Sequence, residues 1–270
     1  VGKNPLTEEL DTLLVKSFTF HAGKDSLNLQ LKQEASAHTV VVRTEDFCGY
    51  VAKQQIWENV KSYNLMKLDP EAFVFENKLG INDPNTAIST DYLFDGDMKG
   101  FTSMALNGNN MGTFIAGPMC FGKPLFELDL KEAKQLAGVR IYTVLSINRP
   151  FLGILFNAYE NRVPCDITIE ASNDRIIWDQ VGNYSESRDL DLGLRWAARC
   201  KGNATFTLMS KLALKNAEPC YLSVDFPVLE KRYRYLRVIV NDTFVARDGK
   251  DYNTQEHVTF HEFELYIGKE

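Results

Sequence analysis

Short runs of alternating or β-branched apolar residues, separated by Gly, Asn and Pro, constrain this chain more than any other feature of its sequence. Such runs follow one another in its second part: 125–130, 138–144, 165–171, 178–181, 221–226, 235–240 and 260–266. Alternation of apolar and polar residues is typical of antiparallel strands with one buried face. No alternation of strands with helices and no Gly-rich phosphate loop accompanies the runs, which disfavours a doubly wound nucleotide-binding fold. The pattern predicts an all-β sandwich or barrel.

The first 80 residues predict a separate small β-rich unit. Three runs there have the alternation or β-branching of strands: 17–21, 27–31 and 39–43. Residues 6–14 place apolar side chains at helical spacing and predict a short helical turn. Residues 77–85 are rich in Asn, Asp, Gly and Pro, which favours turns and a linker. We therefore predict a boundary near Gly80, with an N-terminal unit of unknown type over 1–80 and the main domain over 81–270.

Composition limits the partners. The chain has 270 residues, 44% of them hydrophobic, which is enough for one large core or two small ones. Its 30 Lys and Arg are scattered among 36 Asp and Glu, with a net charge of −6, so no basic face for nucleic acid is expected. No apolar run reaches the roughly 18 to 20 residues of a membrane span. The chain opens at Val1 without a leader, and we expect a secreted or bacterial outer-surface protein, with lipid anchoring through a removed leader as one form of it.

The five cysteines are far apart, with no CxxC pair that would suggest zinc: Cys48, Cys120, Cys165, Cys200 and Cys220. A buried free thiol is the default expectation for each. Cys200 and Cys220 flank a single segment and could pair, but sequence spacing alone leaves both states open.

Four pieces of sequence carry a family resemblance. They are Leu93-Phe94-Asp95-Gly96-Asp97 with Thr102 beyond; 126–130 running into 138–142; 169–174 with Trp178; and 234–238 followed by 260–266. In this order and spacing, from about Asn85 to Gly268, they resemble the discoidin domain (coagulation factor 5/8 type C, galactose-binding-like) of the carbohydrate-binding-module kind. The resemblance implies an eight-stranded jelly-roll β-sandwich, and we expect Trp178 to close its core.

Two segments lie outside this resemblance. Residues 185–217 form a longer insertion than the family has. The N-terminal unit in front of the discoidin-like part is similar in organisation to surface lipoproteins of gut Bacteroidetes.

The resemblance also implies a structural Ca²⁺ site. Asp95 and Asp97 lie on a tight turn, and Ca²⁺ prefers six to eight hard oxygen ligands. Asp97 and Thr102 match the family's loop ligands, and Glu262 matches its C-terminal Glu. The stretch between Asp97 and Thr102 is longer than usual, and Lys99 brings a positive charge close to the site. The alternative is that Asp95 and Asp97 are ordinary turn residues.

The last strand changes phase close to Glu262. Val258 and Phe260 share one alternation phase, whereas Phe263 and Leu265 share the other. A change of phase predicts an irregularity, such as a bulge, that re-aims the Glu262 side chain.

Sugar recognition needs an aromatic platform and a few fixed polar groups, because a pyranose has an apolar C–H face and a rim of hydroxyls. The candidates on predicted loops are Asn148, Arg149, Phe151, Tyr159, Trp196 and Tyr252. For each, the alternative is ordinary packing in the core or at its rim.

Catalytic signatures are missing from the sequence. No serine lies in a Gly-x-Ser-x-Gly elbow, and no cysteine lies in a protease signature. His257 and His261 lie on a predicted strand beside Glu262, and their order differs from His-Glu-x-x-His. We therefore predict a non-catalytic carbohydrate-binding module with a mono- or oligosaccharide ligand. The alternatives are a structural or protein-interaction module with a protein partner and, third, a glycoside-processing enzyme, whose paired carboxylates would meet only in the fold.

Overall fold

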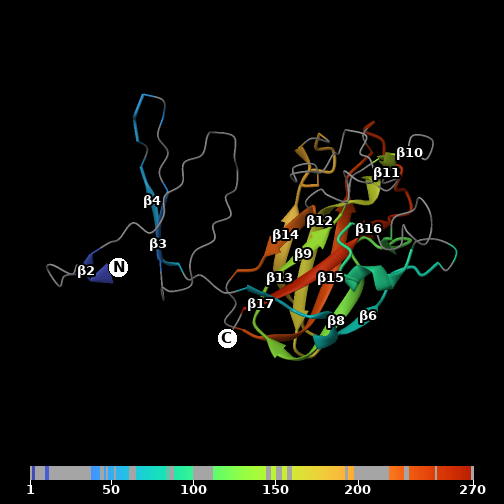
Figure 1. Cartoon of the computed structure of the whole chain (residues 1–270), viewed down its shortest axis with the longest axis horizontal. Helices are drawn as coiled ribbons and strands as arrows, with labels where there is room; N and C mark the ends of the chain where they lie inside the picture. The colour runs from blue at the N-terminus through green and yellow to red at the C-terminus, as the bar shows by residue number, and fades with distance from the viewer. Residues whose placement is uncertain are drawn as a thin grey trace. The chain divides into compact units, whose positions relative to one another are not determined.

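The architecture comes from a computed structural model (Figure 1). It describes residues 2–3, 10–11, 38–42, 46, 48–51, 53–60, 65–83, 85, 88–99, 112–143, 147–149, 154–156, 160–191, 194–197, 219–227, 231–246 and 248–268. The chain folds as two compact units, and the boundary between them lies between Asn64 and Leu65.

The N-terminal unit contains two antiparallel strand pairs among its described residues. β1 (Gly2–Lys3) pairs with β2 (Leu10–Asp11), and β3 (His38–Val42) pairs with β4 (Gln55–Val60). β3 confirms the strand expected over 39–43. Leu10 and Asp11 are extended and not helical, which corrects the expected helical turn over 6–14 at these positions. The strands expected over 17–21 and 27–31 lie outside the described residues.

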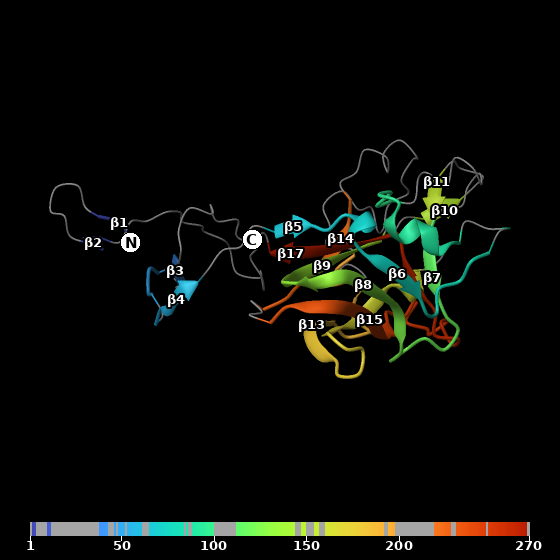
Figure 2. The ribbon, with the colours of Figure 1, turned by 90° about the horizontal axis from the view of Figure 1, so that it is seen from below.

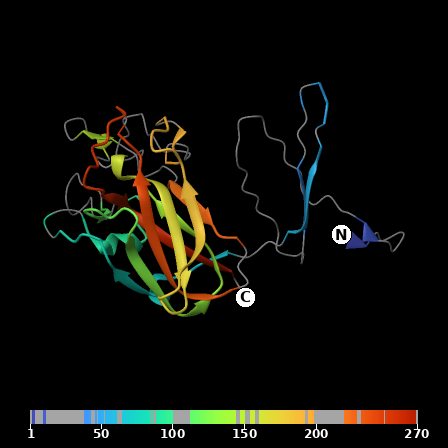
Figure 3. The same ribbon diagram turned by 180° about the vertical axis from the view of Figure 1, so that it is seen from behind.

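The second unit is a β-sandwich of two antiparallel sheets (Figures 2 and 3). The five-stranded sheet has the order β13-β12-β15-β8-β6, with the bounds Asp179–Ser185, Pro164–Ser172, Tyr233–Thr243, Pro124–Lys134 and Val74–Asn77. The four-stranded sheet has the order β14-β9-β17-β5, with the bounds Tyr221–Asp225, Leu136–Tyr142, Glu262–Gly268 and Leu65–Lys67. The all-β sandwich that the sequence predicted is therefore present, with one strand more in its two sheets than the eight that the family implied.

Shorter elements complete the described part of the unit. β16 (Val258–Phe260) pairs with β7 (Phe114–Ala116), and β10 (Ile147–Arg149) pairs with β11 (Ile154–Phe156). The described residues also include the 3-10 helices η1 (Pro70–Ala72), η2 (Thr90–Phe94) and η4 (Glu160–Arg162).

Alternation decides which residues form the core. Phe263 and Leu265 of β17 face inward beside Val139 and Ile141 of β9, and all four are buried. Across the sandwich, Phe126 of β8 is fully buried. Each fully buried residue of this size contributes roughly 1.5 to 3 kcal/mol through loss of apolar surface to water.

The domain boundary lies earlier than predicted. β5 and β6 belong to the two sheets of the sandwich, and they precede the boundary expected near Gly80. The physical reason is that Phe73 is buried in the core and Phe75 packs against it, so this segment cannot belong to a linker. The Asn- and Gly-rich stretch forms turns within the domain instead.

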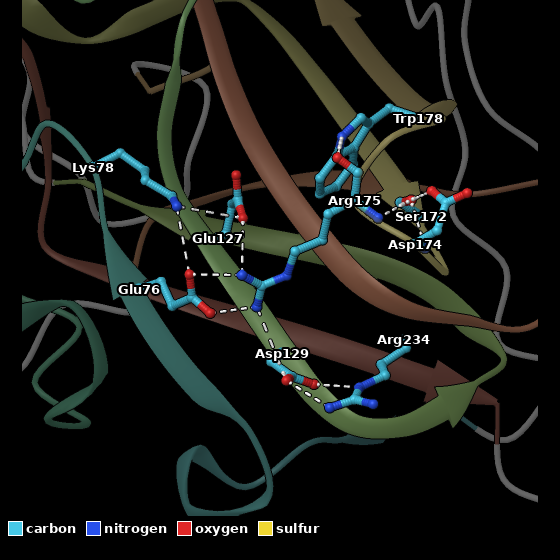
Figure 4. A network of polar contacts seen from close by, with 9 residues as sticks. All are labelled: Glu76, Lys78, Glu127, Asp129, Ser172, Asp174, Arg175, Trp178 and Arg234. Atoms are coloured by element: carbon cyan, nitrogen blue, oxygen red, sulfur yellow. Dashed lines mark hydrogen bonds and ion pairs between the residues drawn. The ribbon is translucent and has the colours of Figure 1, made fainter.

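The turn between β12 and β13 folds over the outer face of the five-stranded sheet (Figure 4). Asp174 Oδ1 accepts hydrogen bonds from the backbone N–H groups of Ile176 and Ile177, as the predicted turn requires. Trp178 does not close the core as expected. It is half-buried, its indole N–H donates to the Arg175 carbonyl, and the Arg237 guanidinium lies 4.1 Å from its ring centre.

Arg175 ties this turn to the far edge of the sheet. Its Nη1 lies 3.0 Å from Glu76 Oε2, and its Nη2 also contacts Glu76 (Figure 4). Its guanidinium lies 4.3 Å from the ring centre of Tyr235. Glu127 Oε2 and Asp129 Oδ2 each lie 3.9 Å from the same guanidinium. The hydrogen bond from Arg175 is the main reason that the pKa of Glu76 is lowered. The Arg175 guanidinium is thus close to three carboxylates, one on β6 and two on β8.

We predict that Arg175→Gln lowers the free energy of unfolding by about 1 to 2 kcal/mol, because Glu127, which is 9% exposed, loses one of its two described cations. Lys250→Gln is the control, since Lys250 lies 3.9 Å from Asp248 and its side chain is 70% exposed. That change should cost less than about 0.5 kcal/mol. Urea unfolding measures both, and equal losses would show that the ion pairs of Arg175 do not stabilise the sheet.

Candidate functional site

The segment that carries Asp95 and Asp97 is fixed by an aromatic anchor. Ser89 caps η2 by accepting a hydrogen bond from the Asp91 N–H. At the other end of the helix, Phe94 packs edge-on against Phe263, with ring centres 6.2 Å apart. Because Phe263 follows Glu262 directly, this contact brings the residues after η2 close to the start of β17.

Glu262 lies where the last predicted strand is interrupted. β16 ends at Phe260 and pairs with β7, whereas β17 begins at Glu262 and pairs with β9. His261, between them, donates its backbone N–H to the Tyr142 carbonyl. The predicted change of phase is therefore confirmed, and it takes the form of a change of partner strand.

Asp95, Gly96 and Asp97 form a turn that contacts Glu262. The Gly96 N–H donates to Glu262 Oε2 over 2.9 Å, although the two residues are 166 positions apart in the sequence. Asp95 Oδ1 accepts from the Asp97 N–H over 2.7 Å. Gly96 has a φ of 81°, in the left-handed region that favours glycine. The turn thus places the carboxylates of Asp95 and Glu262 in one neighbourhood.

The electrostatics of this neighbourhood favour a positive partner. Glu262 is 1% exposed, and burial, together with the charge of Asp95, raises its pKa to about 8. Burial also raises the pKa of Asp95, and the charge of Asp97 adds to the effect. Two carboxyl groups with raised pKa values are stabilised in their ionised forms by a nearby cation.

His261 supplies a second buried polar group. It is 2% exposed, Gly112 O lies 2.8 Å from its Nδ1, and its Nε2 has no hydrogen-bond partner among the described residues. Burial lowers the pKa of its imidazole, which the charge of Asp97 opposes. His261 is therefore a neutral ring close to the acidic turn.

The residues of the turn fit a hard cation in part. Asp95 and Glu262 come together as predicted, whereas Lys99 lies close to Asp97, whose charge acts against the lowering of the Lys99 pKa by burial. Thr102 lies outside the described residues. Within the described ranges, no group of three or more His, Cys, Asp or Glu is placed to hold a metal ion. Calcium at this position stays a prediction.

The candidate sugar-binding residues do not form one described cluster. Trp196 does not lie on an exposed loop as expected. It is 4% exposed, and its indole N–H donates to the Pro164 carbonyl over 2.8 Å, so it packs in the core. Tyr252 is 61% exposed, and its hydroxyl donates to Asp248 Oδ2 over 2.7 Å. Asn148 and Arg149 lie on β10, opposite Leu155 and Ile154 of β11. Phe151 and Tyr159 lie outside the described residues.

The cysteines differ from the default expectation in two places. Cys48 is free but exposed, and Cys220 is disulfide-bonded. Cys120 and Cys165 are buried free thiols, as expected. Cys200, the partner that the sequence suggested for Cys220, lies outside the described residues.

Sequence reasoning missed a polar cluster on the outer face of the four-stranded sheet. Glu264 Oε2 accepts from the hydroxyls of Tyr142 and Tyr266, at 2.5 and 2.7 Å, and Oε1 lies 2.7 Å from Lys67 Nζ. Arg140 donates to the Tyr266 hydroxyl over 2.8 Å. The signal was present, because Arg140 and Tyr142 share one alternation phase and Glu264 and Tyr266 share one. It could not be used before the pairing of β9 with β17 was known.

The fold defines the chain's second unit as an antiparallel two-sheet β-sandwich, and solved structures with a similar arrangement exist. CBM32-3 from a family 31 glycoside hydrolase of Clostridium perfringens is 16% identical with a TM-score of 0.39, covering 75% of this chain and 95% of that one. CpGH89CBM32-5 of the same organism, in complex with GalNAc-β-1,3-galactose, is 7% identical with a TM-score of 0.40, covering 74% and 99%. The C-terminal domain of a chitobiase from Bacteroides fragilis is 12% identical with a TM-score of 0.37, covering 76% and 98%.

No protein-family model matches the sequence, and no curated protein does. The described residues contain no helix with the length and apolar character that a membrane crossing requires.

The raised pKa of Glu262 predicts how the free energy of unfolding depends on pH. Because the folded protein holds this proton more tightly than the unfolded chain, the free energy of unfolding should fall as pH rises from 4.5 to about 8. Glu262→Gln mimics the protonated form, so its free energy of unfolding should not show this fall with pH. In EDTA, the difference in free energy of unfolding between the wild type and the variant should change by up to about 1.4 kcal/mol for each pH unit in that window. Urea unfolding at several pH values measures it, and a constant difference would contradict the buried position of Glu262.

Proposed function

We propose that this chain is a non-catalytic carbohydrate-binding module of a secreted or cell-surface bacterial protein. The observation that carries the proposal is the contact between Gly96 and Glu262, since it joins the first and last of the four sequence pieces that resemble the discoidin family. A chance resemblance of short motifs would not require its two ends to meet in space. The β-sandwich supplies the rigid frame on which such domains carry binding loops.

A structural Ca²⁺ ion is part of the proposal. Asp95, Asp97 and Glu262 would hold it, with Thr102. Its charge would oppose the burial and the carboxylate repulsion that together raise the pKa of Glu262. The ion would stabilise the turn after η2 rather than take part in a reaction. Its positive charge would favour the ionised form of Glu262.

The burial of Glu262 supports a non-catalytic role. A glycosidase needs two carboxyl groups that reach the glycosidic bond, one of them with a raised pKa. Glu262 has the raised pKa, but at 1% exposure its carboxyl group cannot contact a sugar. The pair of Asp95 and Glu262 is therefore better suited to binding a cation than to hydrolysis.

One observation favours a protein-interaction module as the second candidate. Ile176 and Ile177 are 83% and 68% exposed at the tip of the turn between β12 and β13. Adjacent exposed apolar residues on a well-held turn are a feature of protein contact surfaces. This face would be used in addition to sugar binding or in place of it.

Calcium should raise the midpoint of thermal unfolding. An ion that binds only the folded state stabilises it by mass action, by about 2.7 kcal/mol at a concentration of 100 Kd, and each kcal/mol shifts the midpoint of a domain of this size by roughly 2 to 4 °C. The midpoint is measured in excess EDTA and after Ca²⁺ is restored. Asp97→Asn and Glu262→Gln should abolish the rise, whereas Asp91→Asn, an exposed Asp of η2, should keep it. A midpoint that does not respond to Ca²⁺ in the wild type would remove the ion from the proposal.

Sugar binding should depend on Tyr252. Its 61% exposed ring is the described candidate that can offer a face to a pyranose. We expect calorimetry at millimolar sugar to detect binding, and Tyr252→Ala to weaken it by about tenfold, which corresponds to about 1.4 kcal/mol. Tyr50→Ala is the control, because Tyr50 is 78% exposed in the N-terminal unit. If a broad panel of soluble glycans gives no heat with the wild type, the carbohydrate-binding proposal fails.

A further inference from the structure

Arg140 is held between two aromatic rings on the outer face of the four-stranded sheet. Its guanidinium carbon lies 4.6 Å from the ring centre of Tyr221 on β14 and 4.5 Å from that of Tyr266 on β17. Its Nη1 donates to the Tyr266 hydroxyl over 2.8 Å, and Tyr142 is a further phenolic neighbour. The neighbours of this cation are therefore phenols, which fix the orientation of the guanidinium without neutralising it.

The nearby carboxylates are occupied by other groups. Glu264 lies directly opposite Arg140 in the β9–β17 pairing, but its oxygens accept from Tyr142, Tyr266 and Lys67. Glu262 accepts from the Gly96 N–H, and Asp225 accepts from the Ser223 hydroxyl. Among the residues that the structure describes, no carboxylate lies within ion-pair distance of Arg140.

The ion pair of this cluster joins Lys67 and Glu264 and does not include Arg140. Glu264 accepts hydrogen bonds from the Tyr142 and Tyr266 hydroxyls and lies 2.7 Å from Lys67 Nζ. Both carboxylate oxygens of Glu264 are therefore used by groups other than Arg140. Arg140 is a half-buried cation outside that ion pair, and it lies beside Tyr221, which is 40% exposed.

We propose that Arg140 is the anion-binding residue of a subsite for acidic sugars, whose carboxylate or sulfate group it would bind on the outer face of the four-stranded sheet. The inference rests on the proposed carbohydrate-binding function and names the class of ligand. A guanidinium is planar and binds carboxylate and sulfate oxygens through paired N–H groups. Tyr221 and Tyr266 pre-orient it, which reduces the entropy lost on binding.

The experiment compares sugars that differ only in charge. Binding of galacturonate and galactose, glucuronate and glucose, and galactose 6-sulfate is measured by calorimetry at low salt. We expect at least one acidic sugar to bind about ten times more tightly than its neutral counterpart, a factor that corresponds to about 1.4 kcal/mol. Arg140→Met keeps the length of the side chain and removes its charge, so this preference should disappear while binding of the neutral sugar persists.

Two controls make the test specific. Arg234→Met removes an arginine of the five-stranded sheet, which is ion-paired with Asp129, and should leave the preference unchanged. Melting temperatures show whether each variant is folded. Should Arg140→Met not fold, the Nε–H resonance of Arg140 in the wild type, identified by its loss in Arg140→Lys, should shift with galacturonate and not with galactose.

The outcomes separate the inference from the function on which it rests. Equal binding of acidic and neutral sugars, unchanged in Arg140→Met, would overturn the inference and leave the proposed function in place. Binding of no sugar would overturn both. An acidic-sugar preference that survives in Arg140→Met, or an Arg140 resonance that does not respond to any acidic sugar, would assign the anion to another residue and overturn the inference.

Discussion

The packing of aromatic rings around Phe126 is the interaction on which the rest of the sandwich depends. Phe126 lies on β8, and its ring contacts those of Phe75, Phe94, Phe114 and Phe263 at centre distances of 5.6, 6.3, 5.9 and 5.2 Å. These rings come from β6, η2, β7 and β17, so one buried cluster joins both sheets to the segment that carries the acidic turn. Edge-to-face contacts of this kind stabilise a core beyond the burial of apolar area. Without the cluster, the segment that carries the acidic turn would lose the ring contact that holds it beside the start of β17.

The acidic turn shows what this packing makes possible. Burial and neighbouring carboxylates raise the pKa values of Glu262 and Asp95, which costs free energy when they ionise in the folded state, and the apolar contacts of Phe94 and Phe263 hold them together despite that cost. Such a site is suited to a ligand that lowers the free-energy cost of ionising these carboxyl groups. The proposed cation has this property, because a positive charge stabilises both carboxylates in their ionised forms.

The outer faces of the two sheets use arginine in opposite ways. On the five-stranded sheet, Arg175 and Arg234 contact carboxylates, and their charges are balanced within the sheet. On the four-stranded sheet, Arg140 contacts phenols, and it forms no ion pair among the described residues. The first arrangement stabilises the fold, and the second is suited to recognition of an anion. The same residue type has two uses because the cross-strand neighbours differ.

The sequence by itself determined the fold class and the long strands of the sandwich, because alternation along 125–130, 165–171 and 235–240 depends only on which residues are apolar. The motif order also led to Asp95 and Glu262 as partners before their contact was known. Only the tertiary structure decided that Trp196 is buried, that β5 and β6 belong to the sandwich, and that Arg140 lies between two tyrosines. Those facts depend on the pairing of strands far apart in the chain, and pairing is set by the fit of whole faces, which no local pattern contains.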